Sequence, residues 1–289
     1  MKRNILLWSA TVSCLIFAAC FGASAATTID AGNKYAYASN LGWMDWRGDV
    51  SNGAIIGEYV CSGFIYAANV GWINLGSGSP ANQIQYQNNS ATDFGVNHDG
   101  LGHLSGYAYG ANIGWIQFEQ TYGQPKVDSF TGKLSGSVYS ANCGWISLSN
   151  AFAFLQTDSV QKGAIAPDGL PITWLLQNFG TTKIDAAADA DGDGVSNGNE
   201  YLAGTDPNSS ESVLAITSLL RDIPKSNTTL NWNAVGTRYY AIQTNTSLTL
   251  GTWADFYSPA IPGLNNASFN DNPSTNRFYR IRAYRPLTP

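Results

Sequence analysis

Short runs of alternating apolar and polar residues, separated by Gly, Asn and Ser, predict a mainly β protein. Between residues 27 and 155 one pattern occurs four times: a Tyr, two small residues, then Asn-x-Gly-Trp and a Met or Ile. The repeated Trp residues are Trp43, Trp72, Trp115 and Trp145. A Gly/Ser/Pro/Asn-rich insertion around residues 76–92 lengthens the second interval. This spacing is typical of a repeat array.

Each repeat predicts a β-hairpin, because Asn and Gly tolerate the positive φ that tight turns require. A turn centred on Asn69-Val70 would pair Tyr66 with Ile73 and Ala67 with Trp72. Each Trp would then lie opposite a small residue, on the less apolar side of its hairpin.

Two interpretations of the repeated Trp residues stay open. In the one we favour, each ring is buried against the next repeat, because isolated hairpins are marginally stable. In the other, some rings stack on sugars, with Asn74 or Gln117 beside them as polar contacts.

The stretch 189–200 matches the calcium-loop pattern D-x-D-x-D-G-x-x-x-x-x-E. Its carboxylates repel one another, so a cation is their natural partner. The expected ligands are the side chains of Asp189, Asp191, Asp193, Asn197 and Glu200 and the carbonyl of Val195. A short helix at residues 171–179 precedes the loop, but residues 180–188 separate the two. A second short helix should follow the loop and end at Gly204.

Because helix and loop are separated and the loop occurs once, it resembles the calcium loops of dockerin modules and thrombospondin type 3 repeats. The thrombospondin-like resemblance implies that Asp185 and Asp206 could extend the site. The third repeat resembles a Gly-Trp-Ile motif of secreted bacterial surface proteins, a resemblance that implies no particular biochemical role. His98 and His103 flank a turn and are expected to be solvated.

Six strand signals in residues 213–289 predict a C-terminal β-sandwich. Leu230-x-Trp232 and Tyr279-x-Ile281-x-Ala283 resemble two core strands of a fibronectin type III domain. Tyr240 and Ile242 should also face inward. The last strand of such a domain would have to come from residues 285–289. Phe278, Arg280, Arg282 and Tyr284 should alternate onto the outer face as a solvated surface.

Residues 1–26 read as an export signal: a basic start, an apolar run and a small-residue cleavage site. Lipid attachment at Cys20 is the less favoured alternative. After cleavage Cys61 and Cys143 remain, and they form either a disulfide or two buried thiols. The predicted modules are thus a signal peptide (1–26), a repeat module (27–155), a connector (156–212) and a sandwich (213–289).

The charge and the motifs of the chain exclude several classes of function. With 15 basic and 20 acidic residues, the chain has no basic excess for nucleic acid. The apolar run of the export signal is short for a membrane span, and no other run approaches the necessary ~20 residues. No nucleophile elbow, phosphate loop or three-ligand zinc pattern occurs. We therefore expect a non-enzymatic, secreted or cell-surface calcium-binding protein in adhesion or matrix assembly. Its partners would be polysaccharides or other surface proteins; a carbohydrate-binding protein and an unrecognised glycoside hydrolase are the alternatives.

Overall fold

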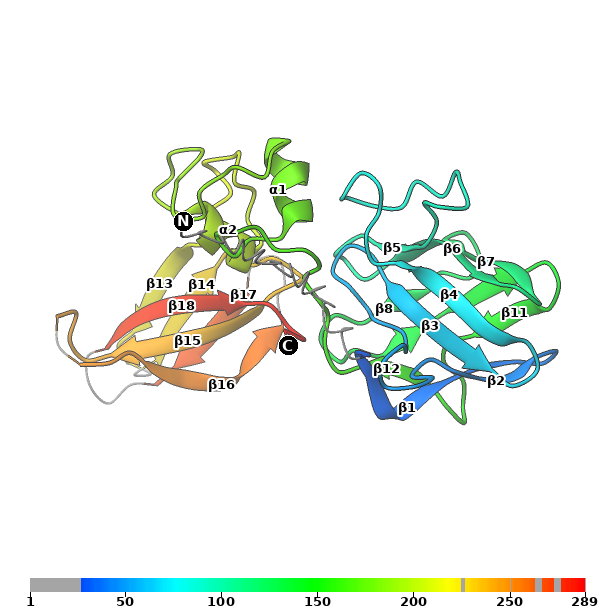
Figure 1. Cartoon of the computed structure of the whole chain (residues 1–289). Helices are drawn as coiled ribbons and strands as arrows, with labels where there is room; N and C mark the ends of the chain where they lie inside the picture. The colour runs from blue at the N-terminus through cyan, green and yellow to red at the C-terminus, as the bar shows by residue number, and fades with distance from the viewer. Residues whose placement is uncertain (1–26, 225–226, 250, 263–266, 273–276, 289) are drawn as a thin grey trace, which may run out of the picture.

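The computed structural model describes residues 27–224, 227–249, 251–262, 267–272 and 277–288. The predicted signal peptide and the alternative anchor at Cys20 lie outside these residues. The described chain is mainly β, as the sequence predicted. It consists of a repeat module, a connector with two short helices, and a pair of packed sheets (Figure 1).

The repeat module contains the strands β1 (Ile29–Ala38), β2 (Gly42–Asp45), β3 (Ser62–Ala67), β4 (Gly71–Ser77), β5 (Val96–His98), β6 (Leu104–Gly110), β7 (Gly114–Phe118), β8 (Lys126–Val127), β9 (Leu134–Ser135), β10 (Ser137–Ser140), β11 (Gly144–Ser147) and β12 (Leu155–Thr157). The four repeat hairpins are β1–β2, β3–β4, β6–β7 and β10–β11, and each pairs with the next. Tyr37 of β1 pairs with Ser147 of β11, so the hairpins close into a ring. β12 also pairs with β1, so the module extends past the predicted boundary at residue 155.

The predicted hairpin register is wrong by one residue. Tyr66 pairs with Trp72, Ile65 with Ile73, and Ala67 with Gly71. The N–H of Val70 donates to the carbonyl of Ala67 (3.2 Å), and Gly71 follows with φ 80°. The loop therefore has three residues and a left-handed glycine, rather than the two central residues assumed from the sequence. Because side chains alternate along a strand, this shift moves every residue of one strand to the other face.

The Asn of each repeat joins neighbouring hairpins at their turns. Its side-chain amide donates to the carbonyl of the residue before Gly in the preceding repeat. The pairs are Asn69 with Leu41 (2.9 Å), Asn112 with Val70 (3.1 Å), Asn142 with Ile113 (2.9 Å) and Asn40 with Cys143 (3.0 Å). The last pair links the first repeat to the fourth, so these bonds also run around the whole ring.

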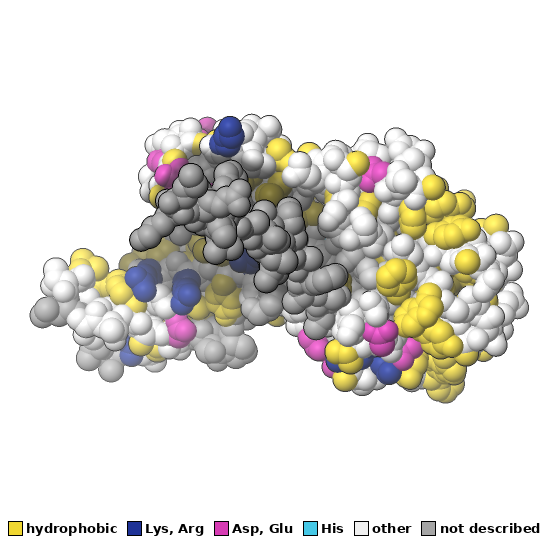
Figure 2. All heavy atoms as spheres, in the orientation of Figure 1, with side chains coloured by type: hydrophobic (Ala, Val, Ile, Leu, Met, Phe, Trp, Pro, Cys, Tyr) yellow, Lys and Arg dark blue, Asp and Glu magenta, His cyan; other side chains and the backbone are white. Residues whose placement is uncertain are grey.

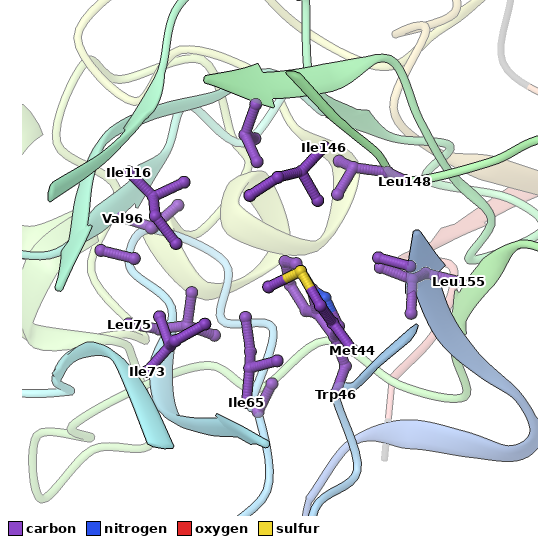
Figure 3. Packing of buried hydrophobic residues seen from close by; sticks show 14 of the residues in the cluster. Met44, Trp46, Ile65, Ile73, Leu75, Val96, Ile116, Ile146, Leu148 and Leu155 are labelled. Atoms are coloured by element: carbon purple, nitrogen blue, oxygen red, sulfur yellow. The ribbon is translucent and has the colours of Figure 1, made fainter. Parts of the chain in front are cut away.

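The interior of the ring is the main hydrophobic core of the repeat module. Met44, Ile73, Ile116 and Ile146, which follow the four Trp residues, are at most 2% exposed. Figure 3 shows these side chains pointing toward one another, with Trp46 and Leu155 beside them. Small side chains such as that of Ala67 also face inward, and they leave room for these four larger side chains.

Cys61 and Cys143 are free, buried thiols, so the disulfide considered from the sequence is not formed in the structure. Cys143 occupies the place in the fourth turn that Leu41 fills in the first. Burial raises the pKa of the Cys61 thiol to about 12. Both residues therefore act as small apolar side chains.

The connector carries α1 (Ile172–Phe179) and α2 (Asn197–Ala203), both near their predicted positions. Gly180 and Gly204 end them in the left-handed conformation, at φ 67° and 78°. Trp174, Leu175 and Tyr201 form a small core between the helices. The Thr173 hydroxyl donates to the carbonyl of Gln83 (2.8 Å), which joins α1 to the insertion of the repeat module.

The C-terminal module contains β13 (Ile216–Asp222), β14 (Asn227–Trp232), β15 (Tyr239–Asn245), β16 (Ala254–Pro262), β17 (Ala267–Asp271) and β18 (Phe278–Tyr284). Two three-stranded sheets, β13-β14-β17 and β16-β15-β18, enclose a common core. All seven residues predicted to face inward do so. Leu230, Trp232, Tyr240 and Ile242 are buried in this core, and the partly buried Tyr279, Ile281 and Ala283 pack against it. The outward alternation of Phe278, Arg280, Arg282 and Tyr284 is also confirmed.

The last strand expected from residues 285–289 is not formed among residues 285–288. This segment turns back to the repeat module instead. The N–H of Val160 donates to the carbonyl of Leu287 (2.7 Å), and the Leu287 side chain packs against the core of the ring. The tail thus ties the two modules together.

Candidate functional site: acidic loop and aromatic belt

The acidic loop, residues 189–200, lies between α1 and α2, and its last four residues form the first turn of α2. Gly192 and Gly194 have φ values of 80° and 92°, which let the loop turn sharply twice. Their N–H groups both donate to the carboxylate of Asp189, each at 2.8 Å. The N–H of Val195 donates to Asp193 (2.7 Å) in the same manner. Glycines and backbone donors thus fold the loop around its own carboxylates.

Three carboxylates converge in this loop. Asp189, Asp191 and Asp193 each offer an oxygen within 4.8 Å of the others. Such close oxygens at positions 1, 3 and 5 of the pattern suit a hard divalent cation.

Four buried oxygens around the loop have no hydrogen-bond donor. They are one oxygen each of Asp191, Asp193, Asn197 and Glu200. Glu200 and Asn197 are fully buried, although both are strongly polar. Buried polar oxygens without partners are rare in folded proteins, so these atoms need an electropositive partner. The residues present therefore fit a calcium ion.

Burial, followed by the negative charge of Asp191, raises the pKa of the Glu200 carboxyl to about 7. The side-chain N–H₂ of Asn197 donates to the carbonyl of Asp185 (3.0 Å), which leaves its oxygen for another partner. The structure thus brings the carboxylates of Asp189, Asp191 and Asp193 together, and Glu200 lies near enough for the charge of Asp191 to raise its pKa.

Asp185 and Asp206 do not join this cluster of carboxylates within the described chain. Asp185 accepts from the N–H of Ala187 (2.8 Å), and Asp206 accepts from the N–H of Asn208 (3.1 Å). Each carboxylate accepts from an N–H of its own turn, and the structure gives no further support for extending the site to them.

Helix α2 joins the acidic loop to both modules. Tyr201, next to Glu200, donates its hydroxyl hydrogen to Glu58 of the repeat module (2.9 Å). Arg285, after β18, forms an ion pair with Glu58 (2.8 Å) and also donates to the Tyr201 hydroxyl. Arg238 binds the carbonyls of Tyr201 and Leu202 at the end of α2. Glu58, Tyr201 and Arg285 form the buried junction of the molecule, which no sequence pattern indicated.

The repeated Trp residues lie on the outer face of the ring, and the prediction that they are buried between repeats is wrong. Trp43, Trp72, Trp115 and Trp145 are 48%, 44%, 46% and 46% exposed. The register places each Trp beside the Tyr of its own hairpin, with ring centroids 4.8–5.2 Å apart. We call these four Tyr–Trp pairs the aromatic belt: Tyr37–Trp43, Tyr66–Trp72, Tyr109–Trp115 and Tyr139–Trp145.

Polar residues accompany the belt. Asn74 and Gln117 lie two residues after Trp72 and Trp115, on the same outer face. Figure 2 shows hydrophobic side chains gathered on the repeat module over β2, β3 and β4. An exposed aromatic row flanked by amides is uncommon on a surface that binds nothing.

The two histidines have different surroundings. His98 is buried, and its Nδ1 lies 2.7 Å from the carbonyl oxygen of Gly57, so the expectation that it is solvated is wrong. His103 is exposed and contacts Asp99 (2.6 Å). Neither belongs to a cluster of three or more metal-ligating residues in the part of the chain that the structure describes.

No protein-family model, curated protein or solved structure matches the chain. Across the described residues, no helix has the length and apolar character needed to cross a membrane. The acidic loop and the aromatic belt are the two features of the molecule that indicate a function.

Proposed function

We propose that this chain is a non-enzymatic, exported carbohydrate-binding protein that acts in adhesion or matrix assembly at the cell surface. The observation that carries the proposal is the outward position of the four repeated Trp residues. Burial of apolar side chains stabilises a fold, so four large rings repeated on the outside need another reason. Sugars present apolar C–H faces that stack on such rings, and hydroxyls that amides bind.

Affinity electrophoresis tests this proposal. Wild-type protein should be retarded in gels that contain one or more of hydroxyethyl cellulose, xylan, mannan or dextran. The double variant Trp43→Ala/Trp72→Ala should bind that polysaccharide about tenfold more weakly or worse, as expected when stacking anchors are removed. Phe152 is 93% exposed and lies outside the belt, so Phe152→Ala is the matched control and should bind normally. Absence of retardation in all four gels would refute the proposal.

We also propose that the acidic loop binds calcium as a structural ion. The unpartnered buried oxygens of Asp191, Asp193, Asn197 and Glu200 support this assignment. An extracellular site of this kind should bind with a dissociation constant of about 10⁻⁴ to 10⁻³ M.

Titration calorimetry of EDTA-treated protein should show binding heat at millimolar calcium together with a raised melting temperature. Asp191→Asn should weaken both effects, whereas Asp206→Asn should not. If wild-type protein shows no binding heat and no shift in melting temperature, a calcium site is excluded.

A further inference from the structure

The four pairs of the aromatic belt are not equivalent, because the insertion between the second and third repeats packs beside one of them and leaves it exposed. Residues 88–91 of this insertion, and Phe94 just after it, stand beside Trp115 and Tyr107. Together they line a pocket of about 490 Å³, within the range of small-molecule sites. We propose that this pocket binds a neutral sugar unit, and that it is the anchoring subsite of the carbohydrate surface proposed above.

Three aromatic rings form the walls of the pocket. Phe94 meets Trp115 nearly at a right angle (84°), with ring centroids 5.1 Å apart. Tyr107 meets the same ring at 77° and 6.0 Å. Trp145, in the next hairpin, contacts only Tyr139 among these aromatic pairs, because Ser137 stands where the third repeat has Tyr107. The pocket therefore offers an apolar corner that the fourth repeat does not have.

The insertion that supplies the outer wall is held in place by buried contacts. Tyr86 is 2% exposed, and its hydroxyl accepts from the N–H of Gly78 and donates to the carbonyl of Cys61 (3.2 Å). Gly76 and Gly95 lie against its ring so closely that an added Cβ would come within 2.6 Å of it. Asn88 accepts from the N–H of Gly95 (3.0 Å). These contacts preform the wall, so little ordering cost would oppose binding.

The rim of the pocket is polar but uncharged. Asn88, Asn89 and Ser90 supply amides and a hydroxyl beside the rings, and none of the seven lining residues carries a charge. A ligand with an apolar face and hydroxyl edges matches both features, whereas an anionic ligand would find no cation among these residues. The pocket thus favours a neutral pyranose over a uronate or a sulfated sugar.

Three single variants test the pocket in the gel assay. Calorimetry then measures their affinity for the polysaccharide that retards wild-type protein. Trp115→Ala and Phe94→Ala should each weaken binding of the neutral polysaccharide about tenfold or more. Trp145→Ala removes an equally exposed ring of the same motif outside the pocket, and should change affinity about twofold at most. Circular dichroism and urea midpoints check that each variant folds, and Trp115→Phe should restore part of the affinity. A gel that contains dextran sulfate should not retard the protein.

The possible results separate this inference from the function on which it rests. If wild-type protein binds none of the neutral polysaccharides, both fail. If wild-type protein binds one and Trp43→Ala/Trp72→Ala reduces that binding while Trp115→Ala and Phe94→Ala do not, the pocket alone is overturned. Equal losses in Trp115→Ala and Trp145→Ala also overturn it, because binding would then depend on the belt in general. Preferential binding of dextran sulfate contradicts the neutral-sugar assignment.

Discussion

The glycine before each repeated Trp decides which way the aromatic ring points. Gly42, Gly71, Gly114 and Gly144 have φ values of 75–80°, a conformation that costs residues with a Cβ about 1–2 kcal/mol. This left-handed residue closes a three-residue turn and places Trp beside Tyr on the outer face. The Gly before each Trp thus places the indole ring on the outer face of the hairpin.

Gly71→Ala tests this role because an added Cβ would meet nothing within 4 Å. The cost should therefore be backbone strain alone, about 1–2 kcal/mol of unfolding free energy in urea titrations. Gly71→Asn should cost less, since Asn tolerates positive φ. If the two variants lose the same stability, strain at this residue is not the reason for glycine.

His98 should make the protein acid-sensitive. Burial lowers the pKa of this buried imidazole below its ordinary 6.5. Above pH 6.5 it is neutral in the folded and unfolded states. As pH falls from 6.5 toward the lower folded-state pKa, the unfolded chain binds a proton that the folded chain does not, so stability decreases.

Urea unfolding between about pH 5 and 7.5 measures this effect. His98→Asn keeps a donor for the carbonyl of Gly57, and it should be less stable than wild type at neutral pH but lose less stability on acidification. His103→Gln is the control at the exposed histidine and should keep the wild-type slope. Parallel slopes for His98→Asn and wild type would contradict the assignment.

Local sequence patterns located the helices and strands, but they did not predict how the strands of the hairpins pair. Both helices could be located from sequence because Pro171 marks the start of the first helix, and Gly180 and Gly204 mark the ends of the two helices. The six sandwich strands could be located because inward residues alternate along each strand. The sequence did not show which side chains of a hairpin face inward. One extra residue in the turn moves the side chains of one strand to the other face, and Asn-x-Gly is compatible with either loop length.

The acidic loop was predictable because its acidic residues fall at fixed positions of one short pattern within a single segment. The Trp115 pocket was not, since Phe94 approaches it from a separate segment. The unequal repeat spacing marked the insertion, but the spacing gave no indication of where the insertion packs.

The acidic loop should keep the connector resistant to proteases. Asp193→Asn retains the acceptor for the N–H of Val195 but loses a carboxylate charge. In millimolar calcium, limited proteolysis should cut this variant several-fold faster than wild type between residues 180 and 212, with both flanking modules intact. Asp185→Asn, at a carboxylate outside the cluster, should be cut at the wild-type rate. Equal cleavage of Asp193→Asn and wild type would show that the charge does not order the connector.

The chain joins its modules through residues far apart in sequence. Glu58 lies in the repeat module, Tyr201 follows the acidic loop, and Arg285 follows the last strand. Phe130 and Tyr239 add a ring contact at 4.8 Å between the same modules. Because Tyr201 is adjacent to Glu200, an ion in the acidic loop would brace α2 at this junction. No pattern within one segment could have predicted a contact among three separate segments.

The junction should behave as one coupled unit. Glu58 and Arg285 are 8% and 6% exposed, so removing one charge leaves the other buried without its partner. Arg285→Met should therefore destabilise the junction by about 3–5 kcal/mol. X-ray scattering should then show a larger radius of gyration, because the modules separate. Adding Glu58→Gln removes the stranded carboxylate and should return the radius most of the way to that of wild type.

Arg282→Met is the matched control for the arginine, since Arg282 is exposed on the outer face of β18. It should leave the radius of gyration unchanged. A double variant that separates further than Arg285→Met alone would mean that Glu58 and Arg285 act independently. In that case the modules would be held by the Phe130–Tyr239 contact and the docked tail, and the ion pair would contribute little.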